Sequence, residues 1–300
     1  MSWLLFGTFV LLMCAAVPLA VALGLAGVAV ITAAHMGIMS VPNTVYAGIA
    51  KYPLIAIPVF ILAGMIFERS GVAARLVRLA EALVGKRAGG LAVAAVLVCM
   101  VLGGISGSGQ ADAAAVGAIV IPAMTRVGYP KEFSASLIAA GGSTAIVIPP
   151  SIALIIYSVL VPQASVPALF AAGLVPGLLC GATLMVAALV FSKIHGWGAD
   201  DPEPAPPLWR SFKEAGWGLL APVIILGGMR SGAFTPTEAA VVAVAYGLVV
   251  GLAIYRSMSW KQVWDLLAES AEISAVILFM VGLAALFGWA VDTIGVFNQF

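Results

Sequence analysis

Charged residues are scarce in this 300-residue chain. Only 9% of its residues are aspartate, glutamate, lysine or arginine, whereas 63% are hydrophobic. A soluble domain usually carries about 25% charged residues, which it needs to cover its surface. The scarcity therefore excludes a soluble globular protein and predicts an integral membrane protein. The net charge of +1 gives no electrostatic reason to expect nucleic acid as a partner.

Cysteine and histidine are also few, with three and two copies. Cys14, Cys99 and Cys180 each lie inside an apolar run, so we expect small buried side chains rather than disulfide partners or metal ligands. The sequence contains no nucleophile–base set, metal motif or phosphate-binding loop. We therefore predict that the protein is not an enzyme and uses no cofactor.

The sequence is rich in long apolar runs. A membrane-spanning helix needs about 20 apolar residues. The predicted spans are residues 3–31, 52–68, 132–160 with a break, 167–192, 217–230, 237–255 and 272–291. Three amphipathic segments, 72–84, 208–216 and 260–272, are expected at the membrane interface. The expected fold class is an all-α polytopic membrane protein.

Two further apolar stretches, 91–105 and 111–125, are too short to span. Each has about 15 residues and reaches only about 22 Å at 1.5 Å per residue, whereas the hydrocarbon core is about 30 Å thick. The stretches meet at a small polar segment, so we predict a re-entrant helical hairpin over about 91–125. A single helix through the break is the alternative.

The basic residues predict an orientation in the membrane. Five of them lie between residues 69 and 90, on one flank of the hairpin, and Arg126 and Lys131 lie on the other flank. The positive-inside rule puts both flanks in the cytoplasm. Alternation along the chain then puts the acidic, proline-rich linker at 199–207 in the cytoplasm as well.

The polar segment Ser106–Asp112 predicts a binding site. A helix break in hydrocarbon exposes backbone groups and survives only where it lines a cavity or binds something. Ser106 and Ser108 offer hydroxyl oxygens beside the carbonyls of a helix C-terminus, which suit a cation. The start of the next helix suits a carboxylate. Asp112 is either a cap of that helix or a direct ligand.

A second break is predicted over residues 141–151. Pro149 and Pro150 lack N–H donors, so the carbonyls of Ala145 and Ile146 lose their helical partners. Unwound carbonyls and serine hydroxyls together form a donor set for sodium. The residues expected to line a substrate position are Gly107, Gln110, Ser143, Thr144 and Ser151. A kinked helix without a ligand is the alternative.

An internal repeat is visible, because residues 57–64 are similar to 276–284. The predicted topology runs the two copies in opposite directions, which is typical of secondary transporters. Residues 1–198 are then a first repeat half, 199–216 a cytoplasmic linker with an interfacial helix, and 217–300 the incomplete start of a second half.

Residues 235–238, with the sequence Thr-Pro-Thr-Glu, predict a helix start. Thr235 is the expected N-cap, proline follows at the first helical position, and Glu238 stands where a capping box needs an acidic side chain. This structural role accounts for the motif, so we assign it no chemistry.

Taken in order, six motifs resemble the large membrane subunit of tripartite ATP-independent periplasmic (TRAP) transporters, over nearly all 300 residues. They are residues 52–64, 106–108 with 111–117, 121–124, 128–129, 148–151 and 232–238. The resemblance implies an elevator-type transporter with an inverted repeat, located in the bacterial inner membrane. It also implies sodium-driven import of a small organic anion, delivered by a periplasmic binding protein, with a small membrane subunit as partner.

The resemblance also implies where sodium binds. The matching positions are Ser106, Ser108, Ala145, Ile148 and Pro150. Family members more often have glycine where this chain has Ala145, a change that a carbonyl ligand tolerates. The second hairpin of the family does not fall within these 300 residues. A related sodium/anion carrier that needs no binding protein, and a non-transporting assembly subunit, are the alternative functions.

Overall fold

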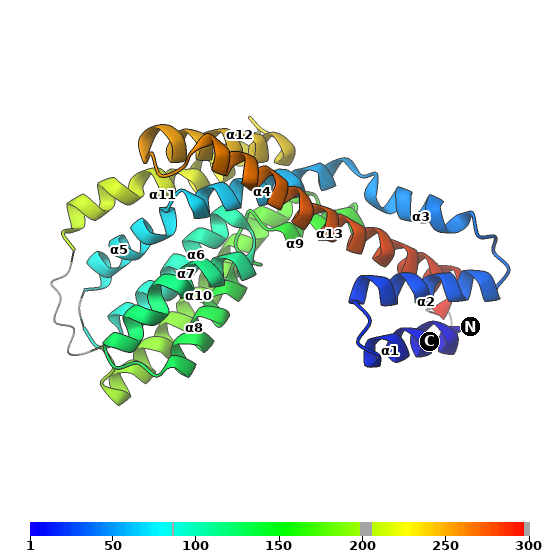
Figure 1. Ribbon diagram of the computed structural model, residues 1–300, viewed down its shortest axis with the longest axis horizontal. Coiled ribbons are helices and arrows are strands. Elements are labelled where there is room, and N and C mark those ends of the chain that lie inside the picture. Colours follow the sequence, from blue (N-terminus) through cyan, green and yellow to red (C-terminus); the bar gives the residue numbers. More distant parts are fainter. Residues whose placement is uncertain (86, 199–205, 297–300) are drawn as a thin grey trace. The chain divides into compact units, whose positions relative to one another are not determined.

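The computed structural model describes residues 1–85, 87–198 and 206–296, and in these ranges it contains helices and no strand. Lys86 and most of the predicted linker, 199–205, lie outside the described residues. Contacts divide the chain into two compact units (Figure 1). The smaller unit contains residues 1–54 and the chain from Ala271 onward, and the larger contains residues 55–270.

The smaller unit contains α1 (Ser2–Cys14), α2 (Leu19–Ala33), α3 (Ser40–Ile49) and the second part of α13 (Trp260–Thr293). The prediction of one continuous span over 3–31 is wrong. The chain turns between α1 and α2, where Ala16 has a φ of 58° and Pro18, which lacks an N–H donor, stands at the N-cap of α2.

The larger unit holds the rest of the chain. It begins with Ile55, the last residue of the short 3₁₀-helix η1 (Tyr52–Ile55). Its further elements are α4 (Ala56–Arg69), α5 (Val72–Val84), α6 (Gly90–Ser106), α7 (Gly109–Arg126), α8 (Lys131–Thr144), α9 (Ile152–Leu160), α10 (Val166–His195), α11 (Leu208–Arg230), α12 (Pro236–Leu248), the π-helix η2 (Val249–Ile254) and the start of α13.

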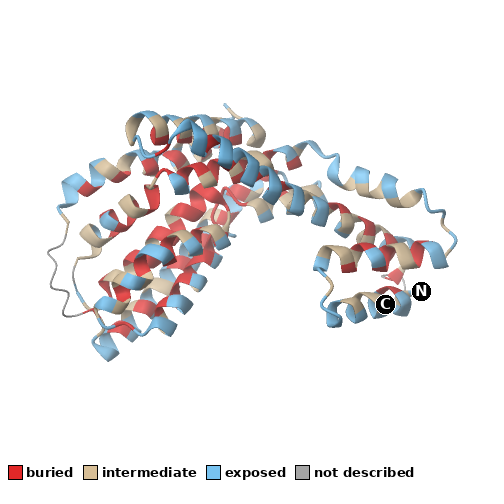
Figure 2. Cartoon of the chain, in the orientation of Figure 1, coloured by how far each residue is buried: buried red, intermediate tan, exposed pale blue. Residues whose placement is uncertain are grey.

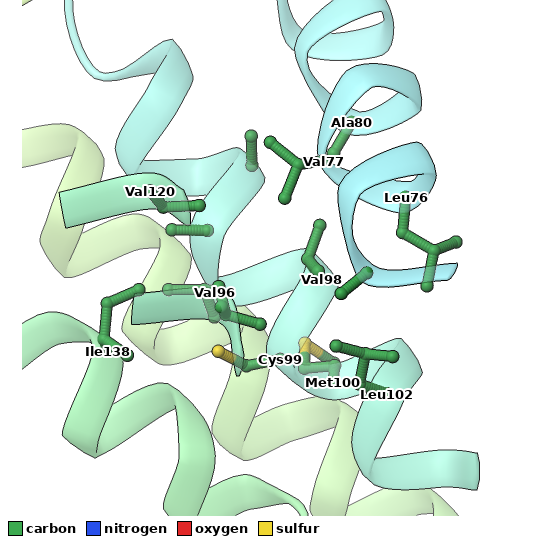
Figure 3. Packing of buried hydrophobic residues seen from close by; sticks show 14 of the residues in the cluster. Leu76, Val77, Ala80, Val96, Val98, Cys99, Met100, Leu102, Val120 and Ile138 are labelled. Carbon is green, nitrogen blue, oxygen red and sulfur yellow. The ribbon is translucent and has the colours of Figure 1, made fainter. Parts of the chain in front are cut away.

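Helix α6 lies at the centre of this unit and packs against α5, α7, α8 and α10. Most of its residues are buried, as expected of a helix that is hydrophobic on every side. Figure 2 shows the buried residues concentrated in this group of helices. Figure 3 shows side chains from α5, α6, α7 and α8 meeting in one core. The end of α6 at the break belongs to this core, because Ile105 is one of its fully buried residues.

Among the described residues, four helical stretches are long and apolar enough to cross a membrane. They are Tyr52–Arg69, Val166–His195, Pro236–Ile254 and Trp260–Thr293. Of the three predicted interfacial segments, only 72–84 forms a helix of its own, α5, between Gly71 and Gly85. The prediction of separate helices at 208–216 and 260–272 is wrong, because α11 and α13 continue through them without a proline or cap at either boundary.

The cysteines divide into two groups. Cys99 is buried in α6, as expected, whereas Cys14 and Cys180 are exposed. The expectation of burial was wrong for these two because their helices direct apolar side chains outward. Leu178 and Leu179, the neighbours of Cys180 on α10, are 50% and 61% exposed. An outward apolar face is normal for a helix whose surroundings are lipid.

Candidate functional site

The first break is a tight turn between two packed helices. Helix α6 ends at Ser106, α7 begins at Gly109, and the two helices contact each other (Figure 1). Gly107 has a φ of +63°, a left-handed conformation that glycine adopts without the cost of a side chain. A single helix through the break is therefore wrong. The depth of this hairpin in a membrane stays a prediction.

The second break separates α8 from α9. Helix α8 ends at Thr144 and α9 begins at Ile152, and the chain between them is not helical. Pro149 and Pro150 account for the interruption, since neither can donate the next helical hydrogen bond. Ser151 is the N-cap of α9 and accepts the N–H of Leu154 at 3.4 Å.

The two breaks touch each other. A Cβ atom on Gly107 would lie 2.7 Å from the carbonyl oxygen of Pro150, and a Cβ on Gly103 would lie 2.5 Å from the Cβ of Ala145. Both distances are too short for non-bonded atoms, so the absence of side chains at these glycines allows the contact. The structure thus brings the hairpin turn against the segment that carries the predicted backbone ligands.

Five carbonyls at the second break accept no hydrogen bond among the described residues, those of Ala145, Val147, Ile148, Pro149 and Pro150. Three of the five, Ala145, Ile148 and Pro150, belong to the predicted sodium ligands. The carbonyl of Ile146 differs, because the Ser151 hydroxyl donates to it at 2.6 Å. One of the two carbonyls that the proline pair deprives of a helical partner is therefore satisfied within the break, and Ala145 is the one left free.

The hairpin turn holds a buried pair of polar side chains. The Ser106 hydroxyl donates to Asp112 Oδ1 at 2.7 Å and accepts the N–H of Ser108 at 3.1 Å. Ser106 is 7% exposed and Asp112 is 3% exposed. The interpretation of Asp112 as a helix cap is wrong, because its carboxylate bonds to a side chain across the turn. Asp112 Oδ2 has no hydrogen-bond partner among the described residues.

The residues expected to line a substrate position lie at the two breaks. Three of their hydroxyls donate within their own segment: Ser143 to Ala140, Thr144 to Gly141 and Ser151 to Ile146. Gln110 is exposed at the start of α7, and Gly107 forms the turn. Their contact with a substrate stays a prediction.

Sequence reasoning missed the role of Gly64 in α4. A Cβ atom there would lie 2.9 Å from both Cα and Cβ of Ser106, so α4 packs directly against the hairpin turn. Gly64 belongs to a motif of the family resemblance, but a single sequence does not indicate which residue a helix glycine contacts.

The motif at Thr235 has the structural role expected of it. The Glu238 carboxylate accepts the Thr235 N–H at 2.8 Å, and Thr235 Oγ1 accepts the Glu238 N–H at 3.3 Å. The predicted capping box is therefore confirmed.

Comparison with known proteins identifies the family. Residues 6–300 match the family model described as "Tripartite ATP-independent periplasmic transporter, DctM component". The isethionate TRAP transporter permease protein DctMQ of Oleidesulfovibrio alaskensis is 41% identical over 95% of this chain and 45% of that protein. The C4-dicarboxylate TRAP transporter large permease protein DctM of Rhodobacter capsulatus is 35% identical over 95% of this chain and 68% of that protein.

A third relative is similar over a comparable length. The 2,3-diketo-L-gulonate TRAP transporter large permease protein YiaN of Escherichia coli is 40% identical over 91% of this chain and 64% of that protein. The chain thus spans about half to two thirds of the length of these curated relatives. It belongs to the DctM component family of tripartite ATP-independent periplasmic transporters, which are permeases and not enzymes.

Proposed function

We propose that this chain is part of the large membrane subunit of a transporter that imports an organic acid together with sodium. The observation that carries the proposal is the contact between the two helix breaks. At that contact the unpaired carbonyl of Pro150 lies against Gly107, between Ser106 and Ser108. Ala145, whose carbonyl is also unpaired, packs against Gly103 one helical turn earlier.

This donor set suits sodium for a simple physical reason. Sodium binds several oxygen atoms, and unwound backbone carbonyls with serine hydroxyls provide them without a charged side chain at the ion. The same carbonyls are costly in hydrocarbon if nothing binds them. The cation therefore compensates backbone groups that the helix breaks leave unpaired.

The relatives support an organic anion as the substrate. Their names specify isethionate, C4-dicarboxylates and 2,3-diketo-L-gulonate, which are all organic anions. The free N–H groups at the start of α7 suit a carboxylate or sulfonate. We propose a periplasmic binding protein and a small membrane subunit as partners, the bacterial inner membrane as the location, and an elevator movement as the mechanism of transport.

The test is sodium-driven uptake by the complete transporter in proteoliposomes, with the small subunit and binding protein present. Radiolabelled succinate and isethionate are the first probes. Ser106→Ala combined with Ser108→Ala should abolish the stimulation by an inward sodium gradient, because two oxygen ligands are lost. The matched control is Ser40→Ala with Ser231→Ala, two serines outside the site whose hydroxyls donate to a carbonyl three residues back.

Each contrary outcome has a meaning. Uptake that is indifferent to sodium in the unaltered protein would contradict the proposal. Equal uptake without the binding protein would instead indicate a related sodium/anion carrier. A protein that neither transports nor responds to sodium would be an assembly subunit.

A further inference from the structure

The hairpin turn contains a carboxylate that the proposed ligand set does not use. We propose that Asp112 is the counter-charge of the cation site and the positioning residue for the Ser106 hydroxyl. This inference rests on the proposed function, because it concerns the same cation. It assigns Asp112 no direct contact with the ion.

The burial of Asp112 supports this role. Asp112 is 3% exposed, and no lysine or arginine forms an ion pair with it in the part of the chain that the structure describes. A buried carboxylate is costly unless a cation or several hydrogen bonds compensate it. One oxygen of Asp112 is hydrogen-bonded to Ser106 and the other, Oδ2, has no partner. A cation bound beside Ser106 would provide the missing compensation.

The direction of the Ser106 hydroxyl also supports this role. A serine hydroxyl has one proton and two lone pairs. Ser106 uses its proton on Asp112 and one lone pair on the Ser108 N–H. The second lone pair is left, and it is what a cation ligand needs. Without Asp112 as the acceptor, the Ser106 hydroxyl could rotate and direct its proton toward the ion position.

Asp112 does not have the usual local role of an acidic residue at the start of a helix. Acidic residues in the first turn of a helix often cap its free N–H groups. Here Ser108 is the N-cap residue, no side chain caps α7, and the Asp112 N–H bonds to the Ser108 carbonyl. The Asp112 side chain instead joins two residues six positions apart across the turn. Two roles remain for the Asp112 side chain: it stabilises the turn, or it provides the counter-charge of the cation and orients the Ser106 hydroxyl. An experiment can distinguish them.

The experiment uses Asp112→Asn, which removes the charge but keeps a side-chain oxygen that can accept from Ser106. The purified chain in detergent is titrated with sodium chloride at constant ionic strength, balanced with choline chloride, and its thermal unfolding midpoint is followed. We expect the sodium concentration for half of the stabilisation to rise about 10–100-fold, the usual effect of losing a partner behind a metal ligand. A role confined to fixing the turn predicts no change.

Two further variants complete the design. Glu238→Gln removes a first-turn carboxylate far from the breaks in sequence and should leave the sodium midpoint unchanged. Asp112→Glu keeps the charge but moves it by one methylene, so its sodium midpoint should rise less than that of Asp112→Asn. If Asp112→Asn does not fold, Asp112→Glu decides alone, and an unchanged sodium midpoint overturns the inference.

The failures of the two proposals differ in this assay. If sodium does not stabilise the unaltered protein more than choline does, the proposed function fails. If sodium stabilises the unaltered protein and Asp112→Asn at the same concentration, the site exists and the assignment of Asp112 is wrong.

Discussion

The turn that begins α7 and the turn that begins α12 contain the same kinds of residue but use them differently. Each has a glycine at positive φ, Gly107 or Gly232, and an acidic residue in the first helical turn, Asp112 or Glu238. Glu238 is satisfied by its own helix start, whereas Asp112 is buried and bonds across its turn. The turn at α12 is therefore satisfied locally, whereas the turn at α7 leaves Asp112 Oδ2 buried and unpaired among the described residues.

The largest effect should come from the two glycines. Gly107→Ala and Gly232→Ala both place a side chain on a residue with left-handed φ, which costs about 1–2 kcal/mol in each variant. The new Cβ at 107 also meets the Pro150 carbonyl, whereas at 232 nothing lies within 4 Å. Overpacking of this kind costs about 1–3 kcal/mol more. The drop in thermal unfolding midpoint should therefore be clearly larger for Gly107→Ala, and equal drops would disprove the contact between the breaks.

An intermediate effect should come from the cap at the second break. Ser151→Ala removes the N-cap of α9 and the bond to the Ile146 carbonyl, which together should cost about 1–3 kcal/mol of unfolding free energy. Ser165→Ala is the matched control, since Ser165 caps α10 through the Ala168 N–H at the same 3.4 Å. We expect the control to lose only about 1 kcal/mol in denaturant or thermal unfolding. If Ser165→Ala lost as much unfolding free energy as Ser151→Ala, the bond from Ser151 to the Ile146 carbonyl would add no stability beyond the cap.

The smallest effect should come from the capping box itself. Thr235→Ala removes one exposed cap and should cost about 1 kcal/mol. Sodium titrations of this variant should match those of the unaltered protein, because the box lies outside the breaks. A shifted sodium midpoint in Thr235→Ala would show that the two turns are coupled, and it would weaken the contrast between them.

The capping box and the helix breaks show what kind of feature a sequence predicts well. Thr235 and Glu238 are three residues apart, and their bonds form within one helical turn, so local spacing determined the outcome. The break at Pro149 and Pro150 is equally local, because the missing N–H groups belong to the prolines themselves. The division of residues 3–31 into two helices follows the same rule, because Pro18 stands at the N-cap of α2 and lacks an N–H donor.

Other features depended on contacts between distant segments. The approach of Gly64 to Ser106, and of Gly103 to Ala145, joins residues about 40 positions apart. Neither approach could be predicted, because a single sequence does not show which residue fills the space beside a glycine.

The amino-acid sequence was enough to predict a helical, apolar chain with breaks within 106–112 and 141–151, because hydropathy, glycine and proline act through local backbone chemistry. The family resemblance depended on the same local motifs, and the comparisons confirmed it. Three outcomes required the three-dimensional arrangement: the breaks touch, Ala145 rather than Ile146 keeps a free carbonyl, and Asp112 is buried beside Ser106. Those outcomes depend on close packing between helices, which brings together groups that the chain itself holds apart.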